Sequence, residues 1–250
     1  MRRALLVLLV GCGSNSPATT PDASQADAAK LIDAPPDSPA STQGFGALSG
    51  MCGVITSAEL VTGSAPQTIQ VTFDFQRQYM DPADRPLLTA GGATMAAIPN
   101  AGGSSGLSEV FAYEELARCE GAVLVHTETE VVYDPPTSKK TDLDVMLDGH
   151  MVGVSVTRAF KGPFGSGDLA MADAVTLAQK KFSDIHESTA GVQTTGDKWD
   201  KQILAVLTDS DTDAQTWLAA TATLDPAVIG DTILVLTTTN GADDFIYTNQ

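Results

Sequence analysis

The stretch that decides the fold is Gly121–Lys161, which reads GAVLVHTETEVVYDPPTSKKTDLDVMLDGHMVGVSVTRAFK. Apolar and polar side chains alternate over Val123–Val132, which predicts a β-strand. A second strand is expected over Thr141–Leu147, and Asp148-Gly149 is typical of a two-residue hairpin turn. The turn leads into a third strand over Met151–Phe160, which is apolar enough that we expect both of its faces to be covered.

Acidic side chains gather on one face of the first two strands. Glu128 and Glu130 share a face of the first strand, and Asp142 and Asp144 share a face of the second. Like charges on neighbouring strands cost free energy unless something compensates them. Two compensations stay open: a divalent metal ion bound by Asp142, Asp144, Glu128 and Glu130, or solvation of this face of the sheet.

A helix is expected over Leu107–Arg118, just before this stretch. Glu114 falls at i+7 on the apolar stripe that begins at Leu107. A carboxylate on a core-facing stripe needs a partner or a function. Arg118, four residues further on, is one candidate partner, and a role in a site is the other interpretation.

The remaining elements place the chain in the α/β (α+β) class. Thr68–Phe75 alternates as an amphipathic strand, and we expect Leu87–Ile98 to pair with it in an N-terminal accessory β-hairpin. The element order α-β-β-β-α-β that follows predicts a mixed β-sheet flanked by helices. The later elements are a helix over Met171–Ile185, a strand over Ile203–Leu207, a helix over Asp213–Leu224, a strand over Ile233–Leu236 and a last short strand over Phe245–Tyr247.

The N-terminus carries a targeting signal. Met1-Arg2-Arg3 is basic, and Ala4–Val10 is apolar but too short to span a bilayer. The next residues, Leu9–Cys12 (LVGC), resemble the lipobox of bacterial lipoproteins, which implies cleavage before Cys12 and attachment of a lipid to that residue. Gly13 rather than Asp follows, which in lipoproteins implies export to the outer membrane. The resemblance therefore implies an envelope protein whose contact with the membrane is its lipid anchor.

Three regions are expected along the chain. Residues 1–11 are the signal peptide, residues 12–44 are a disordered tether rich in Ser, Pro, Ala and Asp, and residues 45–250 are a single α/β domain. In an exported protein, Cys52 and Cys119 are expected to form a disulfide. Two buried free thiols are the alternative.

The formal net charge of −17 argues against a protein that coats nucleic acid non-specifically. The charge is uneven, because Lys139–Lys201 holds eight Lys or Arg against nine Asp or Glu, a net charge of −1. Nucleic acid therefore stays open as a partner, although the net charge disfavours it. The sequence identifies no protein partner.

From Leu107 to Leu207 the element order resembles the core of the PD-(D/E)XK, or restriction-endonuclease-like, superfamily. The resemblance implies Mg²⁺ or Mn²⁺ held by carboxylates, and a water activated against a phosphodiester. Glu114 would be the helix glutamate, and Asp142 the aspartate that opens the second strand. The E-x-K of the third strand falls on Ser155 and Thr157, where this sequence departs from the pattern. The groups that would replace it are Glu128 or Glu130 for the glutamate, and Arg158, Lys181 or Lys139 for the lysine.

A second motif, GVSVTRA at Gly153–Ala159, resembles an uncharacterised family of secreted proteins. Two functions are then expected from different classes. One is a metal-dependent phosphodiesterase or nuclease outside the cytoplasm, with Mg²⁺ or Mn²⁺ as cofactor. The other is an envelope lipoprotein that keeps a nuclease-like scaffold without catalysis and needs no cofactor, and the missing E-x-K favours it. The catalytic groups of the first are Glu114, Asp142, Arg158 and Lys181.

One more acidic motif is DSDTD at Asp209–Asp213. It opens like a calcium-binding loop but lacks the glycine that follows and the terminal glutamate, because Ala220 occupies the twelfth position. Acidic residues before a helix are also stabilised by the helix dipole, so the motif needs no metal to explain it.

Overall fold

A computed structural model describes residues 44–98 and 105–248. The predicted signal peptide, the lipid-bearing Cys12 and nearly all of the tether lie outside the described residues, so these three expectations stay predictions. The described residues form a mixed α/β structure, which confirms the fold class.

A seven-stranded sheet in the order β1-β2-β7-β6-β5-β4-β3 organises the described residues. Strands β3, β4 and β5 form the expected antiparallel meander, and β5, β6, β7 and β2 run parallel. At the far edge β1 pairs with β2 in an antiparallel hairpin. The strands are β1 Gly46–Gly50, β2 Gln67–Phe75, β3 Val123–Thr127, β4 Leu143–Leu147, β5 His150–Arg158, β6 Lys201–Thr208 and β7 Ile233–Gly241.

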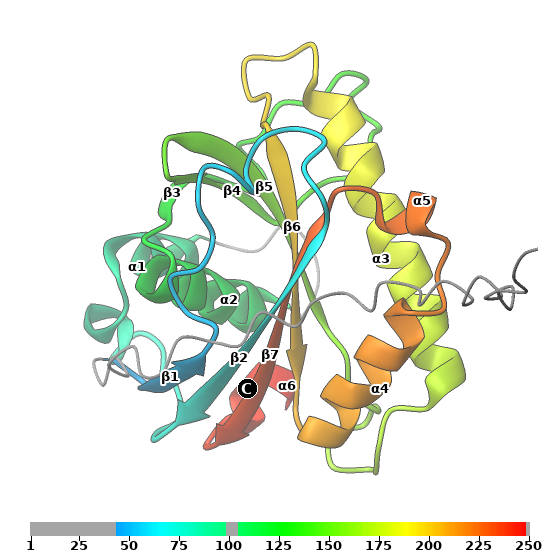
Figure 1. Ribbon diagram of the computed structural model, residues 1–250. Coiled ribbons are helices and arrows are strands. Elements are labelled where there is room, and N and C mark those ends of the chain that lie inside the picture. The colour runs from blue at the N-terminus through cyan, green and yellow to red at the C-terminus, as the bar shows by residue number, and fades with distance from the viewer. Residues whose placement is uncertain (1–43, 99–104, 249–250) are drawn as a thin grey trace, which may run out of the picture. The chain divides into compact units, whose positions relative to one another are not determined.

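Helices cover both faces of the sheet, α1 and α2 on one side and α3 and α4 on the other (Figure 1). A 3₁₀ turn precedes α1. The helices are the 3₁₀ turn Arg85–Leu87, α1 Ala90–Ala97, α2 Gly106–Cys119, α3 Met171–Val192, α4 Asp211–Thr221, α5 Pro226–Ile229 and α6 Asp244–Thr248.

Alternation along the strands divides the apolar residues into two cores. In β6, Ile203 lies in the core under α2 and α6, whereas Leu204 lies in the core under α3 and α4. The first core is aromatic, with Phe111 of α2 packed edge-on against Phe75 at 5.3 Å and Phe245 at 5.0 Å between ring centroids. Both faces of the central parallel strands are therefore buried, as their apolar sequences predict.

The prediction of a strand over Leu87–Ile98 is wrong, because α1 occupies Ala90–Ala97. Thr89 caps this helix, and its hydroxyl accepts from the Gly92 N–H at 3.2 Å. A β-carbon on Gly92 would lie 2.1 Å from Oε1 of Glu114, so the glycine allows α1 to lie directly on α2. Gly92 therefore lies at the contact between two helices.

The prediction of a last strand over Phe245–Tyr247 is also wrong, because this segment is α6. All three residues are buried, whereas an outer strand with one solvated face would alternate. Phe245 packs on Phe111, and the hydroxyl of Tyr247 lies 2.7 Å from that of Thr239. A three-residue apolar run carries no period that separates a helix from a strand.

The expected disulfide joins Cys52 to Cys119. It ties the segment between β1 and β2 to the last residue of α2. Next to it, the carboxylate of Glu120 accepts hydrogen bonds at 2.9 Å from the N–H groups of Gly53 and Ile55. The segment between β1 and β2 is 16 residues long and contains no strand or helix. The disulfide and the hydrogen bonds to Glu120 hold its first part in place.

Candidate functional site

The face of the sheet that α3 covers carries Asp142, the residue just before β4. Leu143 and Val145 point into the core under α2, so the residues that alternate with them, Asp142 and Asp144, face the opposite way. One carboxylate oxygen of Asp142 accepts from the Val156 N–H at 2.5 Å and from the Ser155 hydroxyl at 3.2 Å. Burial raises the pKa of Asp142, and the positive charge of Lys181 opposes that rise.

Lys181, in α3, acts electrostatically on Asp142. Its ammonium donates to the carbonyl oxygen of Val156 at 3.2 Å. Since Val156 also donates its N–H to Asp142, both side chains are held on one residue of β5. The lysine and the aspartate are 39 positions apart in the sequence, and β5 with α3 brings them together.

Glu128, in the turn after β3, is the second carboxylate here. Burial raises the pKa of Glu128, the charge of Asp142 raises it further, and Lys140 opposes the shift. The two carboxylates therefore lie within electrostatic range of one another. We call the group of Glu128, Asp142, Ser155 and Lys181 the Asp142 cluster.

The other predicted metal ligands have partners of their own. Asp144 is fully buried and accepts from the backbone N–H of His126 at 2.7 Å, and the His126 ring nitrogen Nδ1 lies 3.0 Å from the same carboxylate. This contact raises the pKa of His126. Glu130 accepts at 2.8 Å from both the N–H and the hydroxyl of Thr127, which lowers the pKa of Glu130. The structure thus separates Asp144 and Glu130 from the Asp142 cluster.

The two other predicted catalytic residues lie on the opposite face of the sheet. Glu114, in α2, accepts from the N–H of Thr89 at 2.8 Å and from its hydroxyl at 2.6 Å, so its carboxylate fixes the start of α1. Arg158 shares the face of Val156, and it donates to the carbonyl of Ile246 at 2.8 Å. The expected convergence of Glu114 and Arg158 with Asp142 is not found, because the sheet lies between them. Lys139 pairs at 3.6 Å with Asp184 of α3.

Two features are absent from residues 44–98 and 105–248. No group of three or more His, Cys, Asp or Glu side chains there is arranged to hold a metal ion. Over the same residues, no helix has the length and apolar character needed to cross a membrane.

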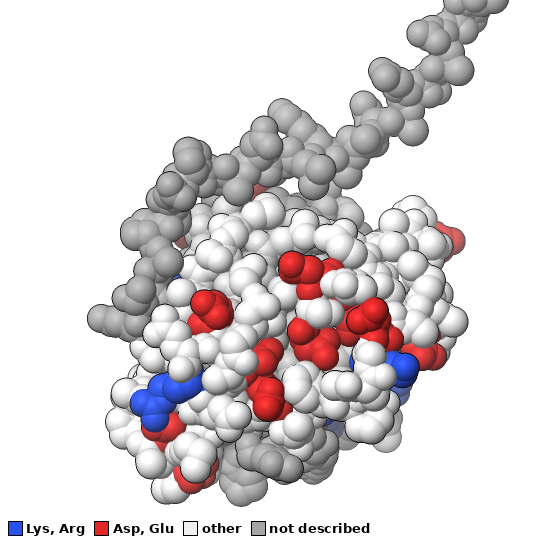
Figure 2. All heavy atoms as spheres, turned by 90° about the horizontal axis from the view of Figure 1, so that it is seen from below, with Lys and Arg blue, Asp and Glu red and all other residues white. Residues whose placement is uncertain are grey.

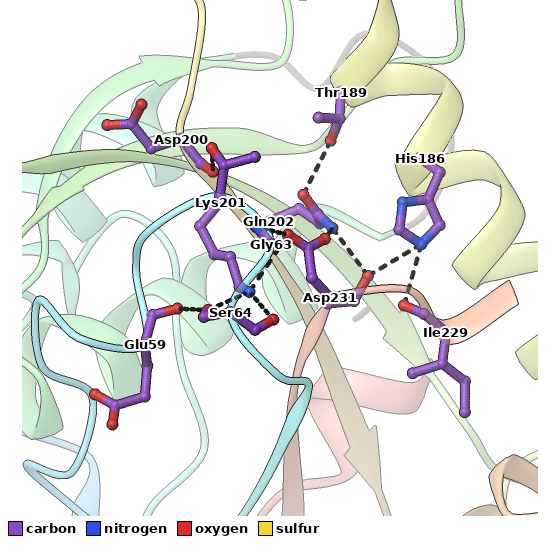
Figure 3. Close-up of polar contacts among 12 residues, drawn as sticks. Glu59, Gly63, Ser64, His186, Thr189, Asp200, Lys201, Gln202, Ile229 and Asp231 are labelled. Carbon is purple, nitrogen blue, oxygen red and sulfur yellow. Dashed lines mark hydrogen bonds and ion pairs between the residues drawn. The ribbon is translucent and has the colours of Figure 1, made fainter. Parts of the chain in front are cut away.

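A buried polar network at the start of β6 was not predicted from the sequence. Lys201 is fully buried, and its ammonium donates to the hydroxyl of Ser64 at 2.7 Å and to its carbonyl at 3.1 Å (Figure 3). Asp231 lies 3.5 Å from the same ammonium and accepts from Gln202 at 2.6 Å and from the Gly63 N–H at 2.7 Å. The network joins the loop before β2 to β6 and to the residues before β7. The only sign of this network in the sequence was Lys201, a lysine at the edge of the apolar run that forms β6.

A second polar group lies at the other end of the parallel strands and includes two aspartates of the DSDTD motif. Asp209 follows β6, Asp213 lies in the first turn of α4, and Asp243 follows β7. Figure 2 looks at that end of the sheet and shows Asp and Glu side chains gathered over the middle of the face, with the visible Lys and Arg toward its sides. Ligands of open α/β sheets bind at this end of the strands.

Comparison with known proteins relates half of the chain to a curated protein. No family model matches the chain, and no solved structure matches it. Among curated proteins, the AAC-rich mRNA clone AAC4 protein of Dictyostelium discoideum is 41% identical over 129 residues, which is 50% of this chain and 18% of that protein. Because the chain spans less than a fifth of this relative, the match shows no family.

Proposed function

We propose that this protein is a lipid-anchored envelope protein that uses a nuclease-like scaffold for binding rather than for catalysis. The observation that carries the proposal is the internal bonding of Asp142. Its carboxylate accepts from the Val156 N–H and from the Ser155 hydroxyl. Ser155 occupies the position where the PD-(D/E)XK pattern has a glutamate. The metal site of that pattern uses this glutamate as a ligand, and here a hydroxyl donor stands in its place.

The location rests on two features. The LVGC sequence before Cys12 resembles a lipobox. The disulfide between Cys52 and Cys119 fits an oxidising compartment, since disulfides persist in exported proteins and are rare in reducing ones. Together they support attachment to the envelope through a lipid.

A second candidate is a metal-dependent phosphodiesterase, and one observation favours it. Glu128 and Asp142 interact electrostatically, and Lys181 acts on the same aspartate. Two carboxylates and a lysine are the groups that the nuclease resemblance implies, with Glu128 and Lys181 in migrated positions. One or two carboxylates suffice for Mg²⁺, which keeps several of its waters.

Cleavage of fluorescent single-stranded and double-stranded DNA and RNA, with Mg²⁺ or Mn²⁺, separates the two candidates. The binding proposal predicts no cleavage above that of Asp142→Asn, and melting temperatures that respond to metal equally in the wild type and in that variant. Glu128→Gln tests the second carboxylate, and Glu130→Gln is its matched control in the same turn. Metal-dependent cleavage that is lost in Asp142→Asn and Glu128→Gln, and kept in Glu130→Gln, would overturn the binding proposal.

The anchor has its own test. When the whole gene is expressed in a bacterium, the wild-type protein should enter the detergent phase of a Triton X-114 separation, and Cys12→Ser should stay in the aqueous phase. A wild-type protein found in the aqueous phase would contradict the lipid anchor and leave the scaffold proposal to the cleavage assay.

A further inference from the structure

Asp213 is a fully buried carboxylate with one oxygen unused. Its Oδ1 accepts from the N–H of Leu169 at 2.8 Å, and its Oδ2 is buried with no hydrogen-bond donor among the described residues. A buried polar atom without a partner costs free energy, and each such atom in a native structure calls for an explanation.

The dipole of the α4 helix does not by itself explain this carboxylate. The cap of α4 is Ser210, whose hydroxyl accepts the N–H of Asp213 at 3.1 Å. The side chain of Asp213 is therefore not needed as the cap of its own helix. It turns instead toward Asp209, with which it interacts directly.

Asp209 is half-buried and acidic neighbours surround it. Burial, a hydrogen bond between its carboxyl group and that of Asp213, and the charges of Asp213 and Asp243 together raise the pKa of Asp209 to about 7. No ion pair of the described residues involves any of these three aspartates. The two facing carboxyl groups therefore hold either a shared proton or a cation.

We propose that Asp209 and Asp213 bind a hard divalent cation, Mg²⁺ or Ca²⁺, beyond the ends of β6 and β7. The unused Oδ2 of Asp213 is the first ligand, and the half-exposed carboxylate of Asp209 is the second. Such ions take carboxylate oxygens and complete their shells with water or carbonyl oxygens. Two carboxylates are consistent with the absence of any larger ligand group in the described residues.

The test is isothermal titration calorimetry of the purified full-length chain, freed of metal with EDTA, with MgCl₂ and CaCl₂ in separate arms. Asp209→Asn keeps the shape of the side chain and should lose affinity by more than about tenfold. Asp211→Asn is the matched control, since this carboxylate is exposed in the same segment, and its affinity should stay unchanged. At about a hundred times its dissociation constant, the ion should raise the melting temperature by about 5–10 °C.

The MgCl₂ and CaCl₂ titrations show which of the two ions binds this site more tightly. Two results would overturn the proposal. One is no heat and no melting shift with either ion up to about 10 mM, roughly ten times the dissociation constant of the weakest calcium sites, which would leave a shared proton only. The other is equal binding by the wild type and Asp209→Asn. Asp142→Asn should bind as the wild type does, so this result is independent of the function proposed for the Asp142 cluster.

Discussion

Ser155 donates its hydroxyl to Asp142 across 3.2 Å, from β5 to the residue that opens β4. The side chains share the sheet face under α3, in the register that a catalytic glutamate and aspartate would occupy in a PD-(D/E)XK core. A donor in place of an acceptor changes the chemistry of the pair. The hydroxyl and the backbone N–H stabilise the charged form of Asp142 without a metal, against the burial that raises its pKa.

The bonding of Asp142 predicts different costs for two substitutions. Asp142→Ala leaves the Val156 N–H and the Ser155 hydroxyl without an acceptor, and we expect a loss of about 2–3 kcal/mol in the free energy of unfolding. Asp142→Asn keeps a carbonyl oxygen in the same place and should cost less than about 1 kcal/mol. Urea denaturation measures both. Equal losses would show that these hydrogen bonds do not hold the start of β4.

Glu115 predicts a dependence of stability on pH. It is fully buried and accepts from the Thr237 hydroxyl, and burial raises its pKa from 4.5 to about 8. The folded protein therefore holds a proton that the unfolded chain releases, so stability is highest below pH 4.5 and is lost as pH rises through about 8. A shift of this size corresponds to a loss of the order of 4 kcal/mol.

Glu115→Gln should remove this dependence. The amide keeps an acceptor for Thr237 and carries no charge, so the variant should match the wild type near pH 5 and exceed its stability near pH 9. Urea denaturation across that range measures the difference, with Glu187→Gln, an exposed position on α3, as the control. Parallel pH profiles for the wild type and Glu115→Gln would contradict the assignment of a buried, protonated Glu115.

Much of the fold could be predicted from local pattern. The apolar spacing of Met171–Ile185 predicts α3, which begins at Met171, and the Asp148-Gly149 turn lies between β4 and β5 as expected. Local pattern failed where a contact between distant elements decides the conformation. Gly91 and Gly92 form part of α1 because Tyr113 and Glu114 of α2 press against them.

The candidate sites were less predictable than the fold. The sequence places Asp142 and Asp144 on one face, and they are there, but it does not show that His126 pairs with Asp144 while Lys181 acts on Asp142. Glu114 looked like a site residue because its carboxylate lies on an apolar stripe. Its partner, Thr89, is 25 residues away and caps α1, a segment that was not expected to be helical. Pairings of this kind depend on the register of strands and helices, which local sequence does not carry.

The disulfide makes a separate prediction. Cys52 and Cys119 are separated by 67 positions, and closing a loop of this length stabilises the fold by roughly 4 kcal/mol on the chain-entropy model. We expect Cys52→Ser with Cys119→Ser to lower the urea midpoint by a corresponding amount. The wild type in dithiothreitol should behave as the double variant does. A reduced protein as stable as the oxidised one would mean that the bond adds nothing to the contacts of Glu120 with the same segment.

Lys201 is a fully buried cation whose partners come from the loop before β2 and from Asp231. Lys201→Met fits the same space but leaves the carbonyl of Ser64 without its donor and Asp231 without its positive charge. Breaking a buried pair from one side costs about 3–5 kcal/mol, and we expect the lower end because Asp231 keeps hydrogen bonds from Gly63 and Gln202. Lys198→Met, at an exposed position three residues earlier, should change stability by less than about 0.5 kcal/mol. If the two variants unfold at the same urea concentration, the network does not fix the loop to the sheet.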